Sequence, residues 1–277
     1  MSESNQPSPS PFWKIRLGIL LLLFAGVTAF VVWVNIEKPP AILKWRDDML
    51  QKLHIRNPLA SEEVIFITAD DVPEKLRKED AEICKAIEDL GILVVRDSAT
   101  RMGNAIHIRE GQGSEKLFQL IRQLKYLNAL NADGAQITDD LCRYLETQKM
   151  LRSLSFGNNP ITSAALPSLC QMEMVTGLYL RGTELTGENL EHLANLKELK
   201  IMDLSGTKLT NEDMKKIAQV KSIHWLLLND LGIDDEGMLH LSQMPELRHL
   251  TIQKGNHISQ EAIQKMRSSS PNDLTID

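Results

Sequence analysis

The chain has 277 residues, 43% of them hydrophobic and 25% charged, with a formal net charge of -6 at pH 7. This composition is typical of a folded protein that can bury a sizeable core. A net acidic chain with a pI near 5.7 is unlike a general phosphate-backbone binder, which presents a concentrated basic face. We therefore expect no nucleic-acid partner.

The beginning of the chain predicts a membrane anchor. Residues 1–16 contain the Pro- and Ser-rich stretch SESNQPSPSP, which cannot bury apolar surface, so we expect a disordered tail. Residues 17–36 read LGILLLLFAGVTAFVVWVNI and carry no charge. A helix of that length is about 30 Å long and matches the hydrocarbon thickness of a lipid bilayer. The segment predicts a single-pass transmembrane helix, with interfacial anchors at Trp13, Trp33 and Trp45.

Two questions about this anchor stay open. The stretch from Val27 to Ala29 resembles a signal-peptide cleavage site, but the apolar run continues past it and favours an uncleaved signal anchor. Basic residues flank the span on both sides, so the positive-inside rule does not decide the orientation. We expect a cytoplasmic tail and an extracytoplasmic repeat domain, with the reverse orientation as the alternative.

Residues 37–60 predict a juxtamembrane helix and a linker. Apolar residues recur there at three- or four-residue spacing and form one helix face that ends before Pro58: Ile42, Trp45, Met49 and Leu53. This face can pack beneath the domain or lie on the membrane. The short length and mixed charge favour packing.

A 24-residue repeat organises the carboxy-terminal part of the chain. The stretch LRGTELTGENL begins at Leu180, and the similar LSGTKLTNEDM begins 24 positions later at Leu204. Six copies begin at Leu127, Leu151, Val175, Leu199, Ile223 and Leu247. In each copy the first, fourth, sixth and eleventh places are apolar, with one inserted residue in the sixth copy. Apolar residues two apart around a polar one predict a short strand with one buried face.

The twelfth place of every copy holds a preferred helix N-cap residue: Thr138, Thr162, Thr186, Thr210, Asp234 and Ser259. Acidic residues follow within the first turn, where the positive end of the helix dipole favours them. We therefore expect a helix to begin there in each copy. A strand and a helix per copy cannot bury their apolar faces alone, so the copies must stack into a parallel sheet with an outer helical layer.

The pattern L-x-x-L-x-L-x-x-T-x-L/I-T resembles the leucine-rich-repeat family, in particular its short, ribonuclease-inhibitor-like and bacterial forms. The resemblance covers residues 103–277 and implies an α/β solenoid with strands on the concave side and helices on the convex side. A worn leading copy places Ile106 and Ile108 in its strand, and Leu274 and Ile276 suggest a closing strand. The ninth place varies, so we expect no continuous hydrogen-bonded ladder there: Ala135, Asn159, Thr183, Thr207, Leu231 and Asn256.

Residues 61–102 predict an amino-terminal α/β cap for this array. Residues 64–67 (VIFI) and 92–95 (ILVV) are strand-like, and Ile83, Ile87 and Leu90 form a helix face between them. Such a unit covers the exposed end of the first copy, as terminal caps of solenoids must.

The sequence contains no catalytic or metal-binding motif. It has no Gly-rich phosphate loop, no H-E-x-x-H and no G-x-S-x-G, and its histidines are scattered. We expect neither enzymatic activity nor a cofactor or metal. The three cysteines, Cys84, Cys142 and Cys170, are best explained as small buried residues, with a Cys142–Cys170 bridge as the alternative.

Residues that flank the buried strand leucines must point to the open, concave face. In the first two copies they are small, whereas the third to sixth copies bring large side chains together. The candidate binding residues are Tyr179, Arg181, Ile201, Asp203, Trp225, Leu227 and His249. Aromatic residues beside an arginine resemble the composition of binding hot spots. The alternative is that these side chains only shield one another, with Arg181 paired to Asp203.

The function predicted from the sequence is that of a non-enzymatic, membrane-anchored repeat protein that binds a protein or peptide on its concave face. A cell-wall or glycan-binding module is one alternative, in which Trp225 and Tyr179 stack on sugar rings. A cytoplasm-facing assembly or adaptor factor is another, and membrane orientation separates it from the other two.

Overall fold

A computed structural model gives the structure of this chain. The described residues are 74–97, 103–252, 254–270 and 273–277. The predicted tail, membrane span and juxtamembrane helix over residues 1–60 lie outside them, as does the predicted strand at residues 64–67. Within the described ranges, every helix is too short or too polar to cross a bilayer.

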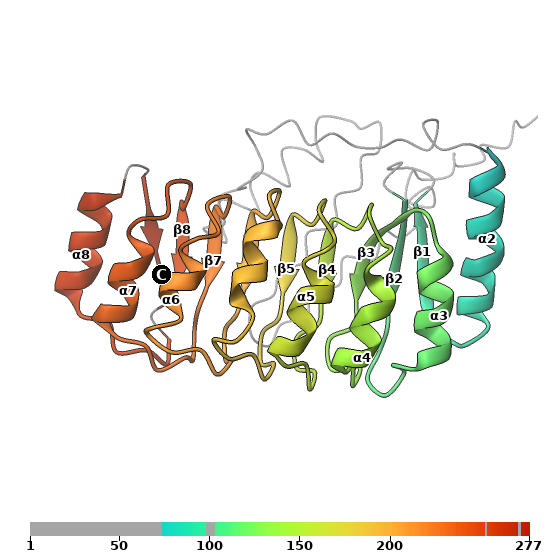
Figure 1. The fold of residues 1–277 in the computed structure, drawn as a ribbon, viewed down its shortest axis with the longest axis horizontal. Helices are drawn as coiled ribbons and strands as arrows, with labels where there is room; N and C mark the ends of the chain where they lie inside the picture. Colours follow the sequence, from blue (N-terminus) through green and yellow to red (C-terminus); the bar gives the residue numbers. More distant parts are fainter. Residues whose placement is uncertain (1–73, 98–102, 253, 271–272) are drawn as a thin grey trace, which may run out of the picture.

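Nine strands form one sheet in which neighbours in sequence are also neighbours in space. The first two strands are antiparallel, and all later pairs are parallel. The helices lie on one side of the sheet (Figure 1). The strands are β1 (Leu93–Asp97), β2 (Gly103–His107), β3 (Leu127–Asn131), β4 (Ser153–Ser155), β5 (Gly177–Tyr179), β6 (Ile201–Asp203), β7 (Trp225–Leu227), β8 (His249–Thr251) and β9 (Thr275–Ile276).

The helical layer contains α-helices and short 3-10 helices, which are labelled η. They are α2 (Glu74–Glu88), α3 (Glu115–Gln123), α4 (Asp139–Cys142), η3 (Arg143–Leu145), η4 (Ser163–Ala165), α5 (Leu166–Leu169), η5 (Leu190–Asn195), α6 (Met214–Ile217), α7 (Asp235–Leu241) and α8 (Gln260–Ser269). One strand and one helical segment per copy confirm the predicted solenoid.

The strand register follows the sequence repeat. Leu154 is paired with Leu130 on one side and Leu178 on the other, so each strand leucine lies beside its equivalent 24 residues away. All residues at the first, fourth, sixth and eleventh places are buried, apart from Ile258, which is half-buried after the inserted residue. Removing these side chains from water is the main force that holds the copies together.

The eighth place of each copy turns the chain out of its strand with a positive φ. Glycine occupies it in most copies, and Asn158 (φ 54°) and Asp230 (φ 57°) occupy it in two others. These residue types adopt left-handed backbone conformations most readily. This requirement explains why the stretches LRGTELTGENL and LSGTKLTNEDM both have glycine at their third position.

Both ends of the array are capped. Cys84 and Ile87 of α2 are buried against the first strands. The Asp80 carboxylate accepts hydrogen bonds from the backbone N–H groups of Lys125 (2.9 Å) and Tyr126 (2.9 Å), which ties α2 to the loop before β3. The helix α2 and the strand β1 lie where the cap helix and the second cap strand were expected, and β1 runs antiparallel to the array. At the other end Leu274 and Ile276 are buried, as predicted for a closing strand.

The ninth-place ladder is discontinuous, as expected. The buried Asn159 amide donates to the Ala132 carbonyl (2.8 Å) and accepts from the Ile137 N–H (2.9 Å), so it joins two copies. Thr183 instead donates to Leu180 within its own copy (2.6 Å), and the threonine of the fourth copy does the same.

A second polar ladder runs along the helix starts and was not predicted. The thirteenth-place side chain of one copy accepts from the backbone N–H at the twelfth place of the next copy. Four junctions use this contact: Asp139 with Thr162 (2.8 Å), Ser163 with Thr186 (2.9 Å), Asn211 with Asp234 (3.1 Å) and Asp235 with Ser259 (2.7 Å). The helix-start polar residues therefore join copies as well as capping helices.

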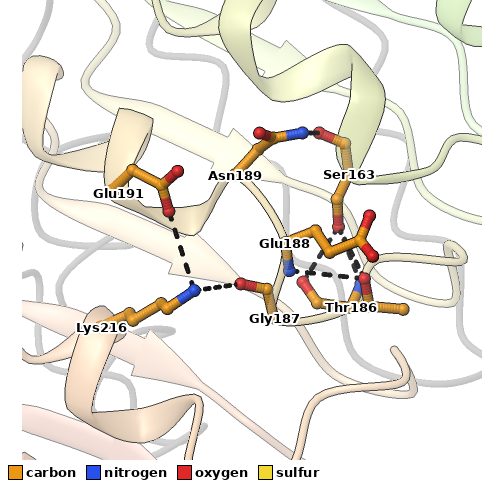
Figure 2. A network of polar contacts seen from close by, with 7 residues as sticks. All are labelled: Ser163, Thr186, Gly187, Glu188, Asn189, Glu191 and Lys216. Carbon is orange, nitrogen blue, oxygen red and sulfur yellow. Dashed lines mark hydrogen bonds and ion pairs between the residues drawn. The ribbon is translucent and has the colours of Figure 1, made fainter.

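The helix-start ladder is interrupted at Gly187, which has no side chain. There Asp213 accepts from the Thr210 N–H within the same copy (2.9 Å). A Cβ atom at Gly187 would lie 1.8 Å from Asp213 Oδ1, so the carboxylate occupies the space of the missing side chain. Figure 2 shows the region of the interruption, where Lys216 donates to the Gly187 carbonyl (2.6 Å) and lies 3.8 Å from Glu191.

The prediction that a helix begins after the twelfth place of every copy is wrong for two copies. In the third copy the helical segment is η5, which begins after Asn189 in a left-handed conformation (φ 56°). In the fourth copy α6 begins after Asp213. Both lie beside Gly187, where the cap contacts differ from those of the other copies.

Candidate binding surface on the open sheet face

The candidate residues predicted from the sequence project from β5, β6, β7 and β8 or from the turn after β5. The register places Ile201, Trp225 and His249 side by side on adjacent strands. It also aligns Tyr179, Asp203 and Leu227 in the neighbouring row. These rows point away from the buried fourth-place side chains. We call this side of the sheet the open face, because the helices pack on the opposite side (Figure 1).

The first row forms a partly apolar surface. Ile201, Trp225 and His249 are each half-buried. The rings of Trp225 and His249 lie 5.8 Å apart between centroids and are tilted by 53°. The indole N–H of Trp225 donates to Thr251 Oγ1 at 3.4 Å. Trp225 is thus oriented by two neighbours while part of its ring stays accessible.

The ring of Tyr179 lies close to Gly177, two residues earlier on the same strand. A Cβ atom at Gly177 would approach the Tyr179 ring at 3.1 Å, so the ring packs over the glycine backbone. Burial, followed by the nearby Asp203 charge, raises the pKa of Tyr179 to about 12. The phenol therefore stays protonated at neutral pH. Gly177 fixes the position of this ring because it leaves room for it.

Asp203 is buried, with 1% of its surface exposed. Its Oδ1 accepts from the Ser205 backbone N–H at 2.9 Å. Burial raises the pKa of the carboxyl above its ordinary value, although the Ser205 hydrogen bonds and the Arg181 charge act in the opposite direction. The described residues hold no salt bridge between Arg181 and Asp203, so the predicted pairing is limited to a longer-range attraction. Asp203 positions its neighbours rather than presenting a surface.

Two exposed apolar side chains on the same open face were not predicted from the sequence. Leu93 and Val95 of β1 are 48% and 40% exposed. They pair with His107 and Ala105 of β2, which places them in the same two rows as the candidate residues. Small residues of β3 and β4 separate them from the large side chains of the later copies. Leu93 and Val95 alternate with the buried Ile92 and Val94, and this alternation was the sequence signal that could have placed them on the open face.

The described ranges contain no cluster of three or more His, Cys, Asp or Glu residues that could hold a metal ion. All three cysteines are free and buried, as predicted, and the alternative Cys142–Cys170 bridge is absent. Burial raises the pKa of the Cys170 thiol to about 12, which makes it unreactive at neutral pH.

The fold and the open face define an α/β solenoid of stacked strand-and-helix repeats. Among solved structures, the chain is similar to internalin C2 from Listeria monocytogenes, with a TM-score of 0.46 and 15% identity over 78% of this chain and 100% of that one. It is also similar to the leucine-rich-repeat ectodomain of the receptor kinase SOBIR1 from Arabidopsis thaliana, with a TM-score of 0.37 and 16% identity over 66% of this chain and 96% of that one. Comparisons with protein-family models and with curated proteins give no match.

Proposed function

We propose that this chain is a non-enzymatic, membrane-anchored repeat protein that binds a protein or peptide on its open face. The binding residues are Tyr179, Arg181, Ile201, Trp225, Leu227 and His249, with Asp203 beneath them as a positioning residue. The span at residues 17–36 holds the domain at a lipid bilayer, and the domain faces the extracytoplasmic side.

The arrangement around Trp225 carries this proposal. The Trp225 ring is half-buried and contacts His249. Leu227 lies on the same strand as Trp225, and Ile201 is its partner on the adjacent strand β6. A rigid aromatic side chain among aliphatic neighbours gains free energy when a partner covers it. Because Thr251 and His249 hold the Trp225 ring in one orientation, binding of a partner costs less side-chain entropy.

Selection of peptides from a random library on the full chain tests the proposal. We expect Trp225→Ala to weaken the selected peptides by roughly tenfold or more, the effect of losing a central aromatic contact. Leu239→Ala is the matched control, because Leu239 is an exposed apolar residue, 49% accessible, on α7 of the helical side. Peptides that bind the Trp225→Ala variant as tightly as the parent would contradict binding through this face.

Glycan binding is the second candidate, because Tyr179 and Trp225 are both half-buried aromatic residues on strands of the open face. Flat aromatic rings are suited to stacking on sugar rings. Titration of soluble cell-wall glycans should then change tryptophan fluorescence in the parent but not in Trp225→Phe. The Phe variant is needed because the chain contains four tryptophans. Unchanged fluorescence in the parent would count against this candidate.

Labelling of a Ser269→Cys variant in intact cells tests the proposed orientation. Ser269 is exposed at the end of α8, whereas all three native cysteines are buried. A thiol reagent that does not cross membranes should therefore report on position 269 alone. Labelling from outside is expected for an extracytoplasmic domain. Protection until lysis would reverse the orientation and favour a cytoplasm-facing assembly factor.

A further inference from the structure

The two long edges of the solenoid differ in charge. At one edge lie the helix starts, where the twelfth to fourteenth places of the copies contain no lysine or arginine. The acids there are Asp139, Asp140, Glu188, Glu212, Asp234, Asp235, Glu236 and Glu261. We call this side the acidic edge.

The opposite edge is formed by the helix ends and the strand starts, at the twenty-third, twenty-fourth and second places. Its basic residues are Lys125, Lys149, Arg152, Lys197, Lys200, Lys221 and Arg248. The acids at these places are fewer, namely Glu173, Glu198 and Glu246, and Asp80 of α2 also lies at this edge. We call this side the basic edge.

Three lysines of the basic edge lie at the surface. Lys149, Lys197 and Lys221 are exposed, and each donates to a neighbouring backbone carbonyl (2.8 Å, 2.5 Å and 2.8 Å). A neutral carbonyl orients an ammonium group without cancelling its charge. Lys197 and Lys221 also line a shared surface hollow of about 310 Å³.

Complementarity to the helix dipole accounts for part of this pattern, because cations are favoured at helix ends and anions at helix starts. It does not account for the second place, which lies at the start of a strand. Arg152, Lys200 and Arg248 occupy that place in three of the copies. The basic edge therefore carries more charge than helix capping requires.

The described part of the chain begins at the basic edge. Asp80, in the first half of α2, bonds to the backbone of Lys125 at this edge. Beyond the other end of α2, the Gly91 carbonyl accepts from Gln112, which follows β2 on the opposite side. The start of α2 at residue 74 is thus on the same side as the basic lysines. Residues 37–73 connect that point to the predicted span at residues 17–36.

We propose that the basic edge lies against the surface of an anionic lipid bilayer, so that the domain stands edge-on to the membrane. Basic side chains near a membrane are attracted to anionic headgroups, and the attraction falls off within a Debye length. The acidic edge is repelled by the same surface. The open face then stays perpendicular to the bilayer and accessible along its length, whatever ligand it takes.

The test uses the full chain reconstituted in lipid nanodiscs with a fluorescent acceptor on the headgroups. A donor label is placed on Gln219→Cys at the basic edge or on Gln260→Cys at the acidic edge, both exposed glutamines in the parent. With roughly 30% phosphatidylglycerol, we expect stronger energy transfer from position 219 than from position 260. The difference should shrink in neutral phosphatidylcholine and at about 0.5 M salt.

Two quadruple variants separate the location of charge from total charge. Lys→Gln at positions 125, 149, 197 and 221 should abolish the difference between the two labels. Lys→Gln at positions 208, 215, 216 and 254 removes the same amount of charge from outside the basic edge. This variant should preserve the difference in energy transfer between the two labels. Thermal unfolding confirms that both variants are folded. Equal transfer from the two labels in anionic discs would overturn the proposal, as would a difference that persists in neutral lipid or in the first variant.

Discussion

The junction between the first and second copies and the junction between the third and fourth copies share one backbone architecture but differ in polar contacts. At the first junction Asn159 and Asp139 both reach across to the neighbouring copy. At the later junction Thr207, the equivalent of Asn159, bonds within its own copy, and Gly187 offers no side chain. The parallel register is the same at both. Buried apolar side chains and backbone hydrogen bonds therefore suffice to stack copies, and polar bridges add stability unevenly.

The largest expected effect comes from breaking the buried bridge at the first junction. Asn159→Ala removes bonds to the carbonyls of Ala132 and Phe156 and leaves the Ile137 N–H without its acceptor. Leaving such groups buried and unpaired should lower the free energy of unfolding by about 2–4 kcal/mol. Thr207→Ala, the equivalent change at the later junction, removes only a bond within its own copy and should cost about 1 kcal/mol. Urea unfolding of the two variants measures both, and equal losses would contradict the distinction between bridging and internal contacts.

Two substitutions can restore the missing ladder contact at Gly187. Gly187→Asn alone should be destabilising by about 1–3 kcal/mol, because its Cβ meets the Asp213 carboxylate. Combined with Asp213→Ala, the new amide can accept from the Thr210 N–H, as Asn211 accepts from Asp234 in the next copy. The double variant should therefore be more stable than the sum of the two single changes predicts.

A second pair of variants separates space from hydrogen bonding at the same site. Gly187→Ala with Asp213→Ala relieves the clash but provides no acceptor. If it is as stable as the double variant that carries asparagine, the helix-start ladder contributes no stability at this junction.

The ladder contact of Asp235 predicts a smaller effect that depends on pH. Hydrogen bonds from the side chain and backbone of Ser259 lower the pKa of Asp235 below its ordinary value of 3.8. A lowered folded-state pKa means that the ionised carboxylate stabilises the fold above the unfolded-state pKa. That contribution is lost as the pH falls through the folded-state pKa. The melting temperature should fall less steeply from neutral to acidic pH for Asp235→Asn than for the parent. Identical slopes would show that ionisation of Asp235 does not stabilise the fold.

The smallest expected effect is that of Lys216, one of the surface contacts at the interrupted junction. Lys216 and Glu191 are 47% and 64% exposed, so solvent and salt screen their attraction. Lys216→Gln should change the free energy of unfolding by no more than about 0.5 kcal/mol. A larger loss in urea unfolding would show that the bond to the Gly187 carbonyl replaces the missing ladder contact.

The solenoid was predictable from the sequence because its period is written into the apolar residues. Leu154 and its equivalents must all be buried, and only stacking of copies buries them. The candidate residues of the open face were predictable for the same reason, since a strand that buries one row must present the next. The burial of Asp203 could not be predicted from the sequence, because neighbouring side chains can cover a residue on the open face.

The sequence alone determined the repeat, its register, the buried set, the closing strand and the residues in each row of the open face. Only the tertiary structure decided which polar side chains bridge two copies, where β1 runs antiparallel and how Tyr179 packs over Gly177. Apolar periodicity is a local property that each copy carries by itself. Hydrogen-bond partners 22 to 27 residues apart depend on distances between copies, such as those from Asn159 to Ile137 and to Ala132, and those distances exist only after the copies have stacked.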